Sequence, residues 1–101
     1  MIRELEENLQ AVTEACRRFG VVRLYVFGSS LRDDFRLGAS DIDLLVEFQP
    51  DESYALVDAY FGLLDELRGL LGNVDLVMAG AVKNPYIARA IDREKQLLYV
   101  A

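Results

Sequence analysis

Apolar residues near the N-terminus recur at alternating steps of four and three, which is the spacing of one face of an α-helix. They are Leu5, Leu9, Val12, Cys16 and Phe19. The pattern predicts a helix over residues 2–19 that buries this face against the rest of the protein. Gly20 comes next. We expect it to end the helix, because glycine adopts the left-handed backbone found at many helix ends.

Later segments have the pattern of β-strands. Apart from Arg23, residues 21–27 are aliphatic, β-branched or aromatic, with apolar side chains on both faces, which is typical of a strand in the middle of a sheet. Residues 41–48 alternate instead, and four apolar side chains share one face, namely Ile42, Leu44, Val46 and Phe48. Residues 74–78 form a third strand pattern. The short apolar stretch at 97–100 suits an edge strand or a docked extended segment.

Helical spacing returns between and after these strands. It predicts a helix over residues 54–71 and another over residues 85–93, with Pro85 at the first helical position. Residues 31–40 are polar and mixed, and predict a loop with room for one helical turn. This order of elements predicts one domain over residues 1–101 with an α/β (α+β) fold. Its core would be a small mixed sheet of three or four strands packed with helices.

Composition narrows the class of protein. Of the 101 residues, 52% are hydrophobic, which supports one packed core and excludes a disordered chain. The single cysteine, Cys16, excludes a disulfide framework and suits a reducing compartment, so we expect a cytoplasmic protein. No apolar run approaches the roughly 20 residues that cross a bilayer, and the acidic N-terminus does not resemble a secretory signal. We therefore expect no membrane association.

Charge and the lack of histidine restrict the chemistry. The formal net charge is −6, which disfavours direct nucleic-acid binding and favours a basic protein partner or bound cations. The chain has no histidine, so His-based triads and His-rich zinc sites are excluded, and acid–base catalysis falls to carboxylates, Tyr, Lys or Cys. Cys16 lies within the apolar helix stripe, and we interpret it as a small buried hydrophobe rather than a nucleophile.

Three aspartates interrupt the predicted strands. Asp41 and Asp43 are two residues apart, so their side chains point to the same face. Asp75 alternates with the apolar residues of its own strand, and a neighbouring strand would bring it beside the other two. Converging carboxylates repel one another, and a hard cation such as Mg²⁺ reverses that cost. Because an isolated Asp-x-Asp in an acidic chain is usually a surface feature, the predicted metal site depends on all three.

The turn after the first strand is a candidate phosphate-binding element. At Gly28-Ser29-Ser30 the backbone N–H groups and a serine hydroxyl can hold phosphate oxygens, and Arg32 can pair with a phosphate. Alone, such a turn is most often only a turn, and such an arginine is usually a surface residue. Followed by acids on the next strand, it predicts that phosphate and metal meet in one cleft, as phosphoryl or nucleotidyl transfer requires.

Together these motifs resemble the nucleotidyltransferase superfamily of DNA polymerase β-like enzymes, which share Gly-Ser, Asp-x-Asp and a later Asp. The chain is still more similar to the minimal nucleotidyltransferase (MNT) proteins, the MntA-like antitoxins of HEPN–MNT toxin–antitoxin pairs. The shared segments are Leu-Tyr-Val-Phe-Gly-Ser at 24–29, Ser-Asp-Ile-Asp-Leu-Leu-Val at 40–46, Val-Asp-Leu-Val at 74–77 and Lys-Asn-Pro-Tyr at 83–86. The resemblance covers nearly the whole chain.

The resemblance implies a Mg²⁺-dependent enzyme that moves AMP from ATP to a hydroxyl group and releases pyrophosphate. The implied catalytic residues and metal ligands are Asp41, Asp43 and Asp75, with Asp75 also acting as base toward the acceptor. The implied nucleotide-binding residues are Gly28, Ser29, Ser30 and Arg32. In the antitoxin branch the acceptor is a tyrosine of the partner HEPN ribonuclease toxin, which the modification silences.

A second function stays open, that of an antitoxin that neutralises the HEPN toxin by binding alone. Asp33 stands where many relatives have glycine, and the loop at 35–39 is about one residue longer than usual. A small-molecule or tRNA nucleotidyltransferase is disfavoured, because no segment is left to form an acceptor site. Four apolar residues near the C-terminus are candidates for either the partner surface or the core, namely Tyr86, Ile87, Leu98 and Tyr99.

Overall fold

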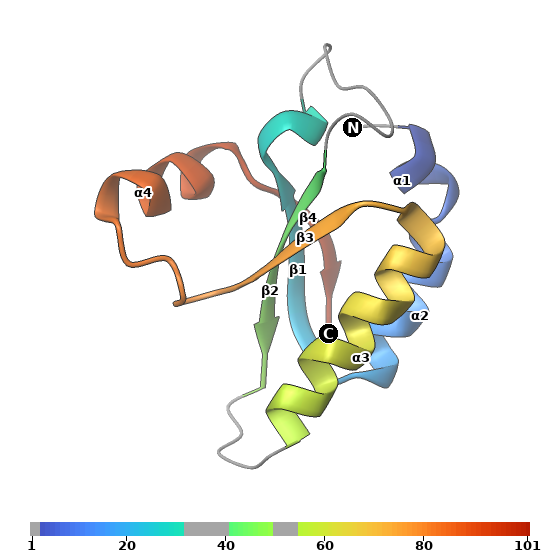
Figure 1. The fold of residues 1–101 in the computed structure, drawn as a ribbon. Helices are drawn as coiled ribbons and strands as arrows, with labels where there is room; N and C mark the ends of the chain where they lie inside the picture. Colours follow the sequence, from blue (N-terminus) through green and yellow to red (C-terminus); the bar gives the residue numbers. More distant parts are fainter. Residues whose placement is uncertain (1–2, 32–40, 50–54) are drawn as a thin grey trace.

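The computed structural model describes residues 3–31, 41–49 and 55–101 as four helices, one 3₁₀ turn and four strands (Figure 1). In chain order the elements are α1 (Arg3–Glu7), α2 (Leu9–Arg18), β1 (Val21–Phe27), η1 (Gly28–Leu31), β2 (Ile42–Phe48), α3 (Ala55–Leu71), β3 (Val74–Met78), α4 (Pro85–Glu94) and β4 (Gln96–Val100). Among the described residues, no helix is long and apolar enough to span a membrane.

The strands form one mixed sheet in the order β3-β2-β1-β4. β1 is antiparallel to both β2 and β4, whereas β2 and β3 are parallel. A parallel pair needs a crossover connection, and α3 lies in the segment that provides it. β4 pairs with β1 at the edge of the sheet. The apolar segment at 97–100 is therefore an edge strand, and the sheet has four strands.

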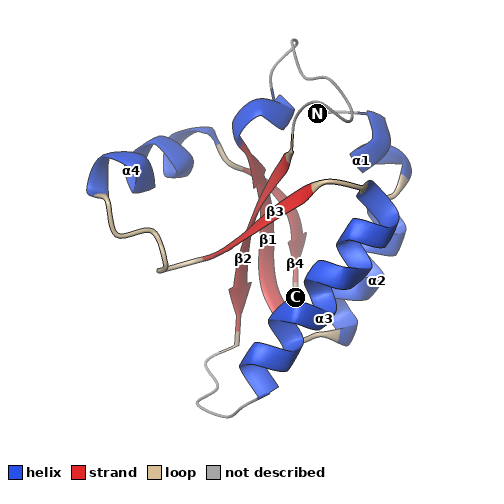
Figure 2. Cartoon of the chain, in the orientation of Figure 1, coloured by secondary structure: helices blue, strands red, loops and turns tan. Residues whose placement is uncertain are grey.

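The core lies between one face of the sheet and the helices α1, α2 and α3 (Figure 2). The predicted alternation of β2 is confirmed, because Ile42, Leu44 and Val46 are buried on this face. Phe48 is partly buried and packs against the same cluster. The apolar stripe of the first helix is confirmed too, with Cys16 among the fully buried side chains. This packing fixes the other face of β2, which carries the odd-numbered residues.

That second face is partly covered by α4, which lies across from α2 and α3 (Figure 1). Leu45 belongs to the odd-numbered face of β2 and yet is only 6% exposed. Ile91 of α4 is 7% exposed, and both residues line the space between the helix and the sheet. A short amphipathic helix thus covers part of the face that carries the aspartates.

The predicted helix over residues 2–19 is wrong in one respect, because it is divided at Asn8. The backbone of Asn8 (φ −103°, ψ 9°) leaves helical geometry, and its side-chain Nδ2 donates to the carbonyl of Glu4 at 2.8 Å. Asparagine side chains compete with helix hydrogen bonding in this way. The apolar residues on both sides of the break still face the core, since Leu5 before it and Val12 after it are both fully buried.

The helix ends follow the local signals. Gly20 has φ +74° directly after α2. At the start of α4 the side chain of Asn84 accepts hydrogen bonds from the backbone N–H groups of Tyr86 and Ile87. The sequence predicted a loop with room for one helical turn within residues 31–40. The structure has a 3₁₀ turn earlier in the chain, at Gly28–Leu31. Residues 32–40 and 50–54 lie outside the described residues.

Candidate active site

Two of the three predicted acids meet on neighbouring strands. In the parallel pairing of β2 with β3, Asp43 lies directly opposite Asp75. Neighbouring strands are about 4.8 Å apart, and directly paired residues point to the same face of a sheet. Asp75 is exposed and Asp43 half-buried, so both carboxylates are accessible from the face that α4 only partly covers. The expected neighbourhood of β2 and β3 is confirmed.

Asp41 is exposed and lies just before β2, two residues from Asp43. A backbone hydrogen bond fixes the start of β2, because the N–H of Ile42 donates to the carbonyl of Asn73 at 2.9 Å. Carboxylate oxygens are the ligands that Mg²⁺ prefers, and acids at paired strand positions fit a shared cation. Across residues 3–31, 41–49 and 55–101, however, no three acidic, cysteine or histidine side chains gather closely enough to hold a metal ion. The metal ligation of Asp41, Asp43 and Asp75 stays a prediction.

Gly28 joins the turn after β1 to the acids. Its φ of +72° lies in the left-handed region, which glycine adopts without the steric cost that a Cβ brings. A Cβ built at this position would collide with Oδ2 of Asp43. The strand register explains this closeness, because Phe27, the preceding residue, pairs with Asp43. The Gly-Ser turn and Asp43 therefore lie directly beside each other, and their roles in binding phosphate and metal stay predictions.

Glu94 is part of this site and was missed from the sequence. It is the last residue of α4, and its Oε1 accepts a hydrogen bond of 3.0 Å from the backbone N–H of Gly28. A carboxylate of the chain itself thus occupies one of the N–H groups predicted to hold phosphate. No local pattern marks Glu94, because the contact depends on how α4 crosses the sheet.

The remaining predicted nucleotide-binding residues are placed less completely. The backbones of Ser29 and Ser30 lie in the 3₁₀ turn Gly28–Leu31, next to Asp43 through Gly28. Their side chains, and all of Arg32, lie outside the described residues. The same holds for Asp33 and the loop at 35–39, on which the binding-only alternative depends. These assignments stay predictions.

The candidates for a partner surface separate into two pairs. Tyr86 is 79% exposed and Ile87 is 53% exposed, both in the first turn of α4. Leu98 and Tyr99 of β4 are partly buried and pack against the core. The first pair is therefore available to a partner, whereas the second has a structural role.

Cys16 is not part of the site. It is fully buried, and desolvation raises the pKa of its thiol to about 12. Because the thiolate is the nucleophilic form, a cysteine with so high a pKa is inert near neutral pH. The interpretation of Cys16 as a buried hydrophobe is confirmed.

Comparison with known proteins identifies the motifs as those of one family. A family model described as "Nucleotidyltransferase domain" matches residues 9–98. A protein of Methanocaldococcus jannaschii named "Putative protein adenylyltransferase MJ0128" is 44% identical over 84 residues, which cover 82% of this chain and 80% of the relative.

Solved structures agree with this result. One described as a "putative minimal nucleotidyltransferase" is 35% identical, covers 91% of this chain and 90% of its own, and has a TM-score of 0.75. Another is a tri-AMPylated Shewanella oneidensis HEPN toxin in complex with MNT antitoxin. It is 20% identical with a TM-score of 0.63, covers 95% of this chain and 72% of its own, and supports the fold alone.

Proposed function

The chain belongs to the nucleotidyltransferase domain family, and from this premise we propose that it transfers AMP from ATP to a hydroxyl group on a partner HEPN ribonuclease toxin and so acts as an antitoxin. The proposal includes tyrosine as the acceptor residue and Mg²⁺ as the metal. One observation carries it, namely the pairing of Asp43 with Asp75 directly beside the Gly28 turn.

The reaction needs little covalent chemistry from the protein. The acceptor oxygen attacks the α-phosphorus of ATP, and the bond from that phosphorus to the oxygen bridging the α- and β-phosphates breaks. Pyrophosphate leaves with the bonding electrons, and the hydroxyl proton passes to a base, for which we propose Asp75. Positioning and charge neutralisation then supply most of the rate. Both depend on a rigid frame, and adjacent strands of one sheet provide it.

The residues proposed to hold Mg²⁺ are Asp41, Asp43 and Asp75. When bound, the ion would neutralise charge on the phosphates and on the departing pyrophosphate. The protein contributes a set of carboxylate oxygens on one face of the sheet and a turn whose backbone N–H groups bind phosphate oxygens. The residues proposed for the turn are Gly28, Ser29, Ser30 and Arg32.

Charge and relatives support a protein acceptor. A net charge of −6 opposes binding to nucleic acid and favours a basic protein, which suits an RNA-cutting toxin. The M. jannaschii relative is named as a protein adenylyltransferase, and the solved S. oneidensis complex contains an AMPylated HEPN toxin. The exposed Tyr86 and Ile87 of α4 are the apolar residues that we propose for the contact.

Label transfer tests the proposal. The chain is mixed with Mg²⁺ and a HEPN toxin that forms a complex with it, and ATP is labelled at the α- or the γ-phosphate in parallel reactions. We expect the toxin to acquire label from the α position only, with one pyrophosphate released for each AMP. Label from the γ position would indicate a kinase instead. A stable complex that acquires no label from either position would contradict the transferase proposal.

The binding-only antitoxin is the second candidate, and the hydrogen bond from Gly28 to Glu94 favours it. A site whose phosphate-binding N–H is already used by a carboxylate would bind ATP weakly. The double variant Asp41→Asn with Asp43→Asn separates the two functions in cells that express the toxin. Continued protection supports neutralisation by binding, whereas loss of protection with a complex still formed supports catalysis.

A further inference from the structure

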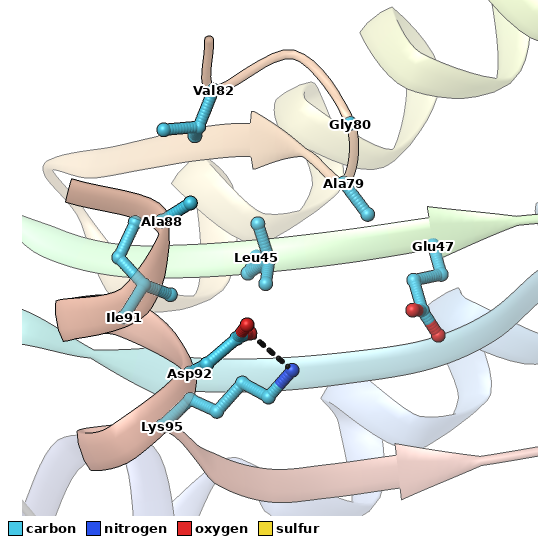
Figure 3. A pocket seen from close by; sticks show the side chains of 9 residues that line it. All are labelled: Leu45, Glu47, Ala79, Gly80, Val82, Ala88, Ile91, Asp92 and Lys95. Atoms are coloured by element: carbon cyan, nitrogen blue, oxygen red, sulfur yellow. Dashed lines mark hydrogen bonds and ion pairs between the residues drawn. The ribbon is translucent and has the colours of Figure 1, made fainter. Parts of the chain in front are cut away.

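A pocket lies on the same face of the sheet as the aspartates, farther along β2. Its volume is about 210 Å³. Figure 3 shows Leu45 of β2 at its floor, with Ala88 and Ile91 of α4 on one side and Val82 above. Leu45 is two residues beyond Asp43 on the same face, so the floor of the pocket begins about 6.7 Å from the acid along the strand. The pocket therefore begins at the next position of this face of β2 after Asp43.

We propose that this pocket binds the heterocyclic base of the nucleotide that donates the transferred group. The inference rests on the proposed function and extends it from the phosphates to the nucleoside. The first support is the direction in which a bound nucleotide would extend from the Gly28 turn. The Gly28 turn lies beside Asp43 at one end of β2, while Leu45 and Glu47 lie toward the other end. With the triphosphate at the turn, the nucleoside extends away from it and toward the pocket.

The second support is the chemistry of the walls. Nucleotide and cofactor sites are mostly apolar, with a few polar groups that fix orientation. The floor and sides here are aliphatic, and charged side chains stand at the rim, as Figure 3 shows for Glu47, Asp92 and Lys95. Lysine offers donors and carboxylates offer acceptors. An aromatic ring edged with nitrogen acceptors and an amino donor matches this combination.

The third support is that the polar rim is held in place. Nζ of Lys95 is 3.0 Å from Oδ1 of Asp92 and lies 4.3 Å from the centroid of the Tyr25 ring. The Lys95 side chain is only 24% exposed. On the opposite rim, Glu47 pairs with Arg23 at 3.1 Å. A rim held by such contacts loses less conformational freedom when a ligand binds.

The test compares binding of Mg²⁺–ATP with binding of Mg²⁺–tripolyphosphate, which has the phosphates but no nucleoside, by calorimetry on the full chain. Ala88→Leu narrows the pocket. We expect it to weaken ATP binding about tenfold or more, because a misfit of a few methyl groups in an apolar pocket has effects of this size. Binding of tripolyphosphate should change by less than twofold. Ala90→Leu is the matched control, since Ala90 lies on the same helix, is exposed and is absent from the pocket lining.

A second variant keeps the test informative if Ala88→Leu perturbs the fold. Lys95→Gln removes the donor at the rim, and we expect ATP binding to weaken while tripolyphosphate binding changes no more than in the charge-matched control Arg68→Gln. Arg68 is an exposed residue of α3, on the other side of the sheet. Equal ATP affinity in Ala88→Leu and Ala90→Leu would overturn the pocket assignment, as would wild-type affinities for ATP and tripolyphosphate that are the same. Failure of both probes to bind the wild type would instead contradict the proposed nucleotide site itself.

Discussion

Gly28 connects the two parts of the candidate site, because its missing side chain leaves room for the carboxylate of Asp43. Glycine is needed here for two independent reasons, the positive φ and the lack of space. Gly20 shares the first reason only, since a Cβ built there meets no atom within 4 Å. Alanine variants at these two glycines therefore distinguish the effect of backbone strain, which both share, from the effect of displacing Asp43, which belongs to Gly28 alone.

We expect Gly28→Ala to abolish nucleotidyl transfer and Gly20→Ala to preserve it. Both variants should lose stability through left-handed strain of about 1–2 kcal/mol, which urea denaturation measures. Only Gly28→Ala displaces Asp43. If both variants transfer AMP equally well at a temperature where both are folded, the contact between the turn and the acid has no catalytic importance.

Glu94 accepts a hydrogen bond from the N–H of Gly28, and under the proposed function it would compete with phosphate for that group. Replacing it with glutamine removes one negative charge from the phosphate site. We expect Glu94→Gln to bind Mg²⁺–tripolyphosphate about fivefold more tightly, which corresponds to roughly 1 kcal/mol for like charges 4 Å apart in water. Glu14→Gln, an exposed change on α2, controls for net charge. An equal gain in both variants would point to general electrostatics instead.

The buried thiol of Cys16 predicts how stability depends on pH. Its pKa is about 12 in the folded protein and about 8.5 in an unfolded chain. Between these values the unfolded chain releases a proton that the folded protein keeps, so the free energy of unfolding falls as pH rises, by at most about 1.4 kcal/mol per pH unit. Below about pH 7 the thiol contributes almost no slope, because it is protonated in both states. Urea denaturation from pH 7 to 10 should show a smaller decline for Cys16→Ala than for the wild type, and equal declines would contradict the prediction.

At the scale of elements, α3 contains two glycines with different surroundings. A Cβ at Gly62 would press into the ring of Phe19, whereas a Cβ at Gly69 would meet nothing within 4 Å. Glycine inside a helix costs about 0.5–1 kcal/mol relative to alanine. Gly69→Ala should therefore raise the free energy of unfolding by about that amount.

Gly62→Ala gains the same helix propensity but must displace Phe19, and overpacking costs about 1–3 kcal/mol. We expect it to be at least about 1 kcal/mol less stable than Gly69→Ala in chemical denaturation. Similar stability for the two variants would show that α2 and α3 are not closely packed at this point.

The elements also show which structural features local sequence patterns were sufficient to predict. Local rules predicted the strands, the alternation of β2 and the start of α4 at Pro85, because each depends on a few consecutive residues. The break at Asn8 was missed, since it depends on a side chain bonding back to Glu4. Within the candidate site, the pairing of Asp43 with Asp75 followed from strand patterns. The contact of Glu94 with Gly28 did not, because it depends on the path of α4 over the sheet.

At the scale of the whole molecule, the two faces of the sheet have separate tasks. The helices α1, α2 and α3 lie on one side of the sheet and α4 lies on the other (Figure 1). The first face buries its apolar residues beneath α1, α2 and α3, while the second presents the aspartates, the Gly28 turn and the pocket under α4. This separation lets charges gather where the core does not have to bury them. A substitution of one exposed acid should therefore affect chemistry far more than folding.

The most direct test of the account is the rate of AMP transfer by Asp43→Asn, with Asp65→Asn as the matched control. Asp65 is exposed on α3, across the sheet from the site. Transfer of α-label from ATP to a bound HEPN toxin is measured for both variants, and thermal unfolding confirms that both are folded. We predict that Asp43→Asn lowers transfer by about 10²–10³-fold or more and that Asp65→Asn transfers AMP at the wild-type rate. Normal transfer by folded Asp43→Asn would contradict the assignment of this site as the reaction centre.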